Sequence, residues 1–454
     1  MPAKIGLEIH GYIDTKEKLF CTCKAEHGAK NAKPNTNICP ICTAQPGCKP
    51  MLPNKSAIDK AIQISLILGC KINEKTPFQR KHYSWPDLPK GYQNTLSGPY
   101  AIPTGEKGEF LGIKIRGCHL EEDPAAWNPQ TGEIDYNRSG SPLIEIVTDP
   151  DFKSSEQVEE WLKQLITTLS YIRAIDKKAG IKSDVNVSIP ETDHTRIEIK
   201  NVNSITNIKN AIDIEIARQT KELPVNQETR RFNAEKQTTE KMRSKEDAQD
   251  YRFINDPDLP VLNITKKRIE TLKKTIPETP QKKLERLIKK HKIPEKSAKI
   301  LTKNIDLIEL FEKVIEKINP GLATRWTTEE LLSVLNYNKK TLEEIDVQPE
   351  HFIELLKLVE NKTLTELNAK DILRNWKEKS ESPKKSAASS SQISDDKQIQ
   401  KFAQQAIKEN KKAVKDFMSG QQQALNFLIG KVMQLSNKRA NYQKAKEILE
   451  KELR

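Results

Sequence analysis

Four acidic residues interrupt strand-like sequence between positions 117 and 147: Glu121, Glu122, Asp123 and Glu145. Glu145 stands inside the apolar run LIEIV. Burying an unpaired carboxylate there would be costly, and a nearby cation offsets that cost. We interpret the stretch as the metal-binding half of a catalytic site.

The N-terminal segment IGLEIH offers two further candidate groups. Ile5, Leu7 and Ile9 recur at every second position, which is the period of a half-buried strand. Glu8 and His10 therefore share one face. A carboxylate beside a neutral imidazole can help to bind a divalent metal ion. An ordinary polar strand face would show the same pattern, so this segment alone leaves both interpretations open.

Four cysteines form two tight pairs separated by fifteen residues: Cys21, Cys23, Cys39 and Cys42. The spacing CxC-x15-CxxC matches a closed tetrahedral zinc site, in contrast to four unrelated thiols. A closed site is structural, so we assign it no chemistry. The other three cysteines (Cys48, Cys70 and Cys118) are interpreted as small core or surface residues.

The segment FQRKHYSWPDLPKGY (78–92) mixes cations with aromatic residues. Its two prolines and one glycine predict an ordered loop. Arg80, Lys81, His82 and Lys90 would suit a phosphate group or an RNA end. A plain surface loop is the alternative.

Several strands and helices must position these groups. Alternation over 111–116, 184–189 and 196–200 predicts further strands with one apolar side. Helical periodicity over 56–68 and 154–172 predicts helices that cover that side, the second with Ser154 and Gln157 as a capping box. We therefore expect an α+β fold with an antiparallel sheet. Its other side would form a cradle floor that includes Asp184, Asn186, Ser188, Arg196, Glu198 and Lys200.

Oxygen-rich ligation with at most one histidine suits Mg²⁺ better than zinc. Mg²⁺ held by carboxylates, with Lys and Arg nearby, is typical of enzymes that transfer phosphoryl groups. The sequence contains neither a P-loop nor a dinucleotide-binding fingerprint. The residues permit phosphoryl transfer without requiring it.

The amino-acid composition bears on the type of partner and on the cellular compartment. The 454 residues include 76 Lys+Arg against 63 Asp+Glu, a net charge of +13. This balance favours a polyanionic partner such as RNA, although a merely basic protein would show it too. No apolar run is long enough to span a membrane, and strand-like sequence starts at once without a signal peptide. We therefore expect a cytoplasmic protein with reduced cysteines.

From about residue 265 the sequence turns helical and charged. The Ser/Lys-rich segment 377–395 predicts a linker or exposed loop, and 396–454 predicts a small helical bundle. We expect a catalytic cradle domain over 1–280 with the zinc-binding insertion near 21–42, a helical domain with linker over 281–395, and a helical tail domain over 396–454.

These motifs together resemble the B-type subunit of the tRNA-dependent amidotransferases. The matching segments are IGLEIH (5–10), PNTNICPIC (34–42), RKHYSWPDLPKGYQ (80–93), HLEED (119–123), DYNRSGSPLIEIVTDPD (135–151), DVNVSI (184–189), RIEIKNVNS (196–204), QETRRF (227–232) and DYRFINDPDLP (250–260). They cover most of the chain. The absence of a large inserted domain in the C-terminal half favours the B-type subunit over its archaeal sister.

The resemblance implies a glutamine synthetase-like cradle and a mechanism. ATP and Mg²⁺ would phosphorylate the side-chain carboxylate of Asp or Glu misacylated on tRNA(Asn) or tRNA(Gln). Ammonia would then displace phosphate, giving Asn-tRNA(Asn) or Gln-tRNA(Gln). The family's amidase subunit (the A-type partner) would supply ammonia from glutamine, and its small C-type partner would brace the pair.

The resemblance also implies residue roles. The family's magnesium ligands fall on His10, Glu121 and Glu145. Its nucleotide and acyl-phosphate site falls near Glu8, Lys81, Asp184 and Asn186, with Arg196, Glu198 and Lys200 lining the same sheet. The tail resembles the family's tRNA-binding domain, in which Lys431, Lys438 and Arg439 are the candidates for phosphate contacts.

Some positions depart from the family's pattern. The segment before Asp184 usually carries acidic, Gly-Ser sequence and an arginine, whereas this chain has Lys178 and Lys182. In the tail, the usual glycine and proline are Lys438 and Tyr442. We interpret Ala424, Leu425, Phe427, Leu428 and Val432 as helix packing.

Two other classes of function compete with this enzyme. A non-catalytic RNA-binding scaffold would use the zinc module and the basic tail, but it has no need for His10, Glu121 and Glu145 on one face. A metal-dependent hydrolase would need an activated water and leaves the tail unexplained.

Overall fold

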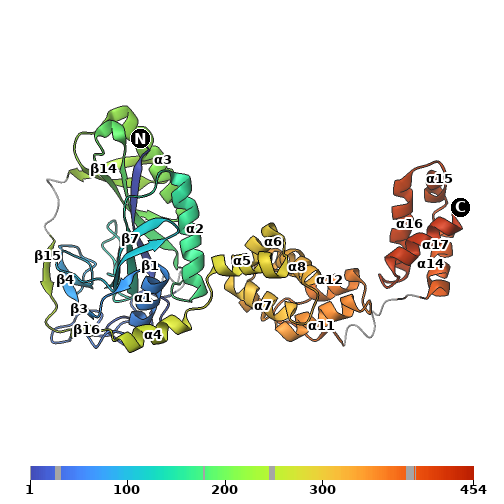
Figure 1. The fold of residues 1–454 in the computed structure, drawn as a ribbon, viewed down its shortest axis with the longest axis horizontal. Coiled ribbons are helices and arrows are strands. Elements are labelled where there is room, and N and C mark those ends of the chain that lie inside the picture. The colour runs from blue at the N-terminus through green and yellow to red at the C-terminus, as the bar shows by residue number, and fades with distance from the viewer. Residues whose placement is uncertain are drawn as a thin grey trace. The chain divides into compact units, whose positions relative to one another are not determined.

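The computed structural model describes residues 2–25, 32–176, 179–244, 251–384, 393 and 395–453. The chain divides into two compact units, Met1–Thr279 and Pro280–Arg454 (Figure 1). Lys178 and residues 385–392 of the expected linker lie outside the described residues. The expected mixed α+β architecture is confirmed, whereas the division into three domains stays a prediction.

A twelve-stranded sheet organises the N-terminal unit. Its main path runs β14-β13-β12-β11-β1-β10-β7-β5-β4-β15, with β6 and β2 branching from β7. The strands on the main path are β1 (Lys4–Tyr12), β4 (Gln79–His82), β5 (Tyr92–Thr95), β7 (Ile113–Glu122), β10 (Pro142–Thr148), β11 (Ile181–Ser188), β12 (Ile197–Asn203), β13 (Glu228–Asn233), β14 (Thr238–Ser244) and β15 (Arg252–Asn255). The branch consists of β2 (Lys71–Ile72) and β6 (Gly105–Phe110).

Small strand pairs lie outside that sheet. They are β3 (Lys75–Thr76) with β16 (Leu262–Asn263), and β8 (Ala126–Trp127) with β9 (Ile134–Asp135).

The expectation of a wholly antiparallel sheet is wrong at one place, because β12 and β13 are parallel. Parallel neighbours need a long crossover, and α3 (Ile205–Glu222) lies between them in sequence. Alternation in the sequence indicated the strand that became β12 but not its partner β13, so this crossover was not predicted.

Helices cover the apolar side of the sheet, as expected. The covering helices are α1 (Lys55–Ile67), α2 (Ser155–Tyr171) and α3, and their apolar residues share one core with the sheet (Figure 1). Asn54 caps α1 by accepting from Ser56 and Ala57. The predicted capping box of α2 forms in altered shape: Ser154 accepts from the Gln157 amide, while the Gln157 side chain accepts from the Lys153 amide.

Two strands appear where the sequence predicted a loop. Gln79–His82 and Tyr92–Thr95 pair with each other, and the first also pairs with β15. The prolines and glycine lie between them, so they shape only the connection. The prediction of one loop over 78–92 is wrong because pairing with distant Arg252–Asn255 is not visible locally.

The N-terminal unit ends with α4 (Lys266–Thr275). Among its described residues, the named elements of the C-terminal unit are helices, apart from an isolated β-bridge between Ile393 and Ala440. Its first helices are α5 (Pro280–His291), α6 (Glu295–Leu301), α7 (Ile305–Ile315), α8 (Pro320–Arg325), a π-helix (Trp326–Leu331), α9 (Leu332–Asn338), α10 (Leu342–Ile345), α11 (Pro349–Glu360) and α12 (Glu366–Arg374).

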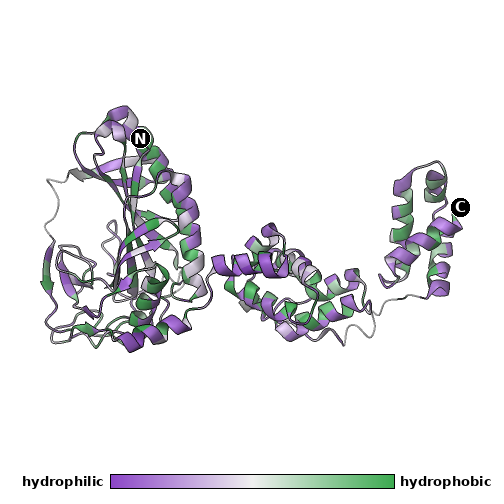
Figure 2. Ribbon diagram, in the orientation of Figure 1, coloured by the Kyte–Doolittle hydropathy of each residue, from purple (hydrophilic) through white to green (hydrophobic). Residues whose placement is uncertain are grey.

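The tail helices are α14 (Asp396–Glu409), α15 (Lys411–Met418), α16 (Gln422–Leu435) and α17 (Tyr442–Glu452). They share an apolar core of their own. Figure 2 shows hydrophilic and hydrophobic residues alternating along these helices, as in amphipathic helices that bury one face. Among the described residues, no helix has the length and apolar character needed to cross a membrane.

Candidate functional site

Three side chains expected to bind magnesium meet on the polar side of the sheet. His10 lies on β1 directly opposite Glu145 on β10, and Glu121 lies on β7, the next strand. His10 Nε2 is 3.6 Å from Glu145 Oε1 and 3.9 Å from Glu121 Oε2. Strands distant in sequence therefore bring the imidazole and both carboxylates together.

Both carboxylates are buried, Glu121 to 3% exposure and Glu145 to 7%. Burial, followed by the charge of Glu145, raises the pKa of Glu121. Burial opposes ionisation of Glu145 too, yet electrostatic interactions with His10, His119 and Lys81 lower the pKa of that carboxyl. Glu145 Oε2 is buried without a hydrogen-bond partner. Two buried acids with an unsatisfied oxygen are the environment in which a divalent cation fits.

The residues that hold Glu121 were not predicted from the sequence. Thr95 donates a hydrogen bond to Glu121 Oε1 at 2.5 Å, and Gln93 donates to Oε2 at 3.3 Å. Both lie on β5, which pairs with β7 at Thr95 and Glu121. The sequence pattern did not single out either residue. Gln93 is the last residue of the charged and aromatic segment 80–93, and Thr95 lies beyond that segment.

Lys81 borders the same cluster from β4. Its positive charge favours the ionised forms of Glu121 and Glu145 and so opposes the effect of burial on both carboxyl groups. Its ammonium also lies 4.8 Å from the centre of the Tyr251 ring. A lysine beside two acids can bind a phosphate group that a metal ion also binds.

A second acidic cluster adjoins the first along β1. Glu8, Asp184 and Glu198 come from β1, β11 and β12, and their carboxylate oxygens lie within 4.8 Å of one another, a spacing that could hold a metal ion. Lys200 Nζ lies 2.9 Å from Asp184 and 3.0 Å from Glu198. Asn186 donates to Glu8 at 3.3 Å. The structure thus groups three residues expected at the nucleotide site (Glu8, Asp184 and Asn186) with two expected on the same sheet (Glu198 and Lys200).

Charge interactions mark this second cluster. Burial first, and then the nearby acids, raise the pKa of Glu8. Burial opposes the charge of Lys200, but Asp184 and Glu198 hold the pKa of its amine above its ordinary value. Lys200 therefore serves as a built-in cation for the acids around it.

Arg196 and Lys182 lie at the margins. Arg196 is exposed and comes just before β12, two residues from Glu198. Lys182 is opposite His10 in the β1–β11 register, on the polar side of the sheet. Burial lowers the pKa of Lys182. The departure at Lys182 therefore places a lysine beside the candidate magnesium ligands.

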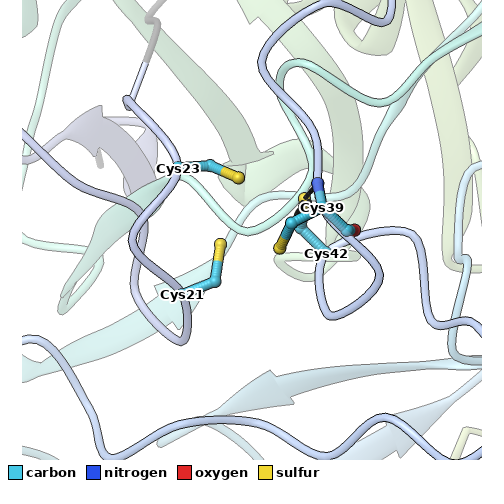
Figure 3. A group of neighbouring side chains, drawn as sticks. All are labelled: Cys21, Cys23, Cys39 and Cys42. Carbon is cyan, nitrogen blue, oxygen red and sulfur yellow. Dashed lines mark hydrogen bonds between the residues drawn. The ribbon is translucent and has the colours of Figure 1, made fainter.

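The four paired cysteines come together as expected (Figure 3). All four sulfur atoms lie within 4.8 Å of one another, and Cys39 and Cys42 are 3.9 Å apart. A zinc–sulfur distance of about 2.3 Å in a tetrahedron gives sulfur–sulfur edges of about 3.8 Å. The donor set and spacing fit a closed zinc site.

A fully buried lysine supports this cysteine cluster. Lys18 is 1% exposed, and its ammonium donates to the carbonyls of Asn37 and Tyr136 and to Cys42 Sγ at 3.4 Å. A hydrogen bond from Cys21, with help from the Lys18 charge, lowers the pKa of Cys42 to about 4. Four thiolates around Zn²⁺ leave a net negative charge, which this lysine offsets. No pattern in the sequence singled out Lys18.

The tail residues are placed separately within the C-terminal unit. Lys431 lies 5.6 Å from the centre of the Phe427 ring, and Lys438 Nζ is 2.5 Å from Asp371. Arg439 is half-buried. Phe427 is 51% exposed, so its assignment to helix packing is wrong. The buried residues of α16 are Leu425, Leu428, Ile429, Val432 and Met433, and Phe427 lies off this stripe.

The two tail departures fall at positions with special backbone requirements. Lys438 has φ of +62°, in the left-handed region that glycine adopts most easily. Tyr442 is the first residue of α17, a position that proline favours. The substitutions therefore keep the backbone course while giving up the residues best suited to it.

Comparison with known proteins identifies the family. A family model described as the GatB/GatE catalytic domain matches residues 3–270, and one described as the GatB domain matches 309–453. The chain belongs to the GatB family. It is 42% identical over 467 residues to the B subunit of the aspartyl/glutamyl-tRNA(Asn/Gln) amidotransferase of Methanocaldococcus jannaschii, covering 99% of this chain and 98% of that relative.

Two further GatB relatives carry the same name. The protein from Methanothermobacter thermautotrophicus is 41% identical over 457 residues, covering 99% of this chain and all of the relative. The protein from Methanobrevibacter smithii is 41% identical over 455 residues, with 99% of each covered. The chain is thus one subunit of an amidotransferase, of the ligase class.

Proposed function

We propose that this GatB-family chain activates the side-chain carboxylate of Asp or Glu attached to tRNA(Asn) or tRNA(Gln) by ATP-dependent phosphorylation, and then directs its amidation. The observation that carries the proposal is the convergence of His10, Glu121 and Glu145 on the polar side of the sheet. The relatives' names supply the substrates: aspartyl- and glutamyl-tRNA of the Asn and Gln pathways.

His10, Glu121 and Glu145 would hold Mg²⁺, with the unpartnered Glu145 Oε2 as a ready ligand atom. When bound, this ion would screen the negative charge on phosphate and carboxylate. Thr95 and Gln93 keep Glu121 oriented. These two hydrogen bonds would keep Glu121 in place as a metal ligand.

Lys81, Asp184 and Asn186 are the proposed nucleotide-binding residues. Lys81 would neutralise phosphate charge that develops during transfer. Glu8, Glu198 and Lys200 complete the proposed catalytic set, because Lys200 holds two acids of the second cluster in place. Arg196 is assigned to the rim, where an exposed guanidinium can meet a phosphate.

The chemistry balances in two steps. A carboxylate oxygen attacks the γ-phosphorus of ATP, and ADP leaves. Ammonia then attacks the acyl carbon, and phosphate departs with the former carboxylate oxygen. The proposed partners are an amidase that makes ammonia from glutamine, a small bracing protein of the same complex, and the tRNA itself. Zn²⁺ at the four cysteines would be structural.

A non-catalytic RNA-binding scaffold explains the tail charges but not the buried acids. Glu121 and Glu145 carry a desolvation cost that a scaffold has no reason to maintain. The proposed enzyme accounts for both the tail charges and the buried acids.

An isotope experiment tests the proposal. The assembled enzyme is given ATP and Glu-tRNA(Gln) or Asp-tRNA(Asn) with ¹⁸O in the side-chain carboxylate. We expect one ¹⁸O atom in each phosphate released, in step with amide formed. Amide formation without transfer of the label would contradict acyl-phosphate chemistry. Correctly charged Gln-tRNA(Gln), which has no such carboxylate, is the control.

A further inference from the structure

An aromatic ring stands next to the candidate magnesium site, outside the proposed catalytic set. Tyr251 is 40% exposed, and its ring centre lies 4.8 Å from the ammonium of Lys81. Lys81 is opposite Gln93 in the β4–β5 register, and Gln93 donates a hydrogen bond to Glu121 Oε2 at 3.3 Å. The ring therefore borders the reacting centre on the side of β15.

The ring is held by its neighbours. Tyr83 meets it edge-on, with ring centres 5.7 Å apart and planes at 88°, and Phe253 contacts it at 6.4 Å and 64°. Phe253 packs over Gly98, where a Cβ atom would collide with the phenylalanine ring. We call Tyr83, Tyr251 and Phe253 the aromatic rim.

Strand pairing places the aromatic rim on the polar side of the sheet. Lys81 faces Phe253 in the β4–β15 register. Tyr83 and Tyr251 lie just beyond the ends of β4 and β15, and the contacts of the Tyr251 ring with Lys81, Tyr83 and Phe253 bring all four side chains together. Gln93, the residue opposite Lys81, holds Glu121 through its side chain, so the rim lies beside the buried acids.

We propose that Tyr251 stacks against the base of the 3′-terminal nucleotide of the aminoacyl-tRNA, with Tyr83 and Phe253 as its supports. This inference rests on the proposed function. The reacting carboxylate is joined through its amino acid and the terminal ribose to that base, so a base platform must lie within a short reach of the metal site. Aromatic side chains stack unpaired bases, and a lysine beside the ring complements the adjoining phosphate.

The adenine of ATP offers the same stacking chemistry, so the test must separate the two. Tyr251→Leu removes the aromatic face while keeping an apolar side chain, and Tyr251→Phe keeps the face and is the matched control. In the assembled enzyme, we expect Tyr251→Leu to raise the KM for misacylated tRNA by about tenfold. The KM for ATP should stay within about twofold, and Tyr251→Phe should behave as wild type.

A binding measurement supplies a readout that loss of folding would not mimic. Terminal adenine is replaced by the fluorescent base 2-aminopurine, and binding is followed without ATP. We expect quenching with the wild type and Tyr251→Phe, and markedly weaker quenching with saturating Tyr251→Leu. Thermal unfolding of each variant confirms that it is folded.

Two outcomes would overturn the inference. One is a raised KM for ATP with an unchanged KM for tRNA, which would assign the ring to the nucleotide. The other is a Tyr251→Leu enzyme with wild-type KM values and full quenching. In both cases the wild type still performs ATP-dependent amidation, whereas failure of the proposed function would show as a wild type that forms no amide.

Discussion

At the scale of single residues, the two clusters differ in what supplies positive charge. The Glu8, Asp184 and Glu198 cluster contains its own cation, Lys200. Glu145, in contrast, keeps a buried oxygen without a hydrogen-bond partner. The cluster that contains Glu145 is therefore the one that favours binding of an external ion.

Glu145→Gln tests that interpretation. The substitution keeps the shape but removes a negative ligand, so we expect amidation to fall by about a hundredfold or more. Affinity for tRNA should remain within about twofold of wild type, since charge contacts with the tRNA backbone are assigned to the tail. Steady-state amidation at saturating Mg²⁺ and a tRNA filter-binding assay give the two readouts. Wild-type turnover would remove Glu145 from the magnesium site.

Lys18 is expected to act through the cysteines. Lys18→Met keeps the buried stem but removes the donor to Cys42 and the compensating charge. Because residues behind metal ligands commonly change affinity by about 10–100-fold, we expect zinc to be lost to a chelator at least about tenfold faster. The measurement is zinc release followed with a chromogenic chelator. Lys16, an exposed lysine two residues away, is the control as Lys16→Met.

At the scale of elements, alternation in the sequence predicted which residues of β1, β11 and β12 share a face. It could not predict that β1 lies between β10 and β11, with β7 one strand further. That order brings His10 to Glu121 and Glu145, and it depends on pairing between segments far apart in the chain. For the same reason Gln93, Thr95 and Lys18 were missed, since their roles appear only after the chain has folded.

The start of α17 offers an element-scale prediction. Tyr442 is the first helical residue, and Asn441 before it has φ −67° and ψ 119°, which is compatible with a following proline. Tyr442→Pro should therefore stabilise the tail by about 0.4–1 kcal/mol, mainly by restricting the unfolded chain. The denaturant midpoint of tail unfolding measures it. Lys446→Pro, inside the same helix, should destabilise by about 3 kcal/mol, and equal effects of both changes would contradict the argument.

At the scale of the whole molecule, the net charge of +13 favoured a polyanionic partner such as RNA, fitted a merely basic protein as well, and did not locate any binding surface. Composition also indicated a helical second half, and the named elements in the described part of the C-terminal unit are helices. Its arrangement could not be predicted, because amphipathic helices pack in many ways with the same pattern. Phe427 shows this at one position, since its apolar character did not reveal that it lies off the buried stripe.

Joint replacement of Lys431, Lys438 and Arg439 by alanine tests the proposed tail interface. Each lost phosphate contact should reduce the slope of log affinity against log salt by about 0.7–0.9. Affinity for tRNA should fall at moderate salt, while amidation at saturating tRNA changes little. Lys273→Ala, on α4 of the N-terminal unit, is the control. An unchanged salt slope in the triple variant would exclude these residues.

The position of β1 in the sheet has a consequence for synthesis of the protein. This strand is made well before its partners, which are residues 143–147 and 181–188. On the ribosome, Lys4–Tyr12 must wait until both have emerged before it can be hydrogen-bonded on its two edges. During that interval an apolar strand can pair wrongly with other segments. Binding by a chaperone should therefore increase the yield of native enzyme, and so should slow translation of the residues up to 188.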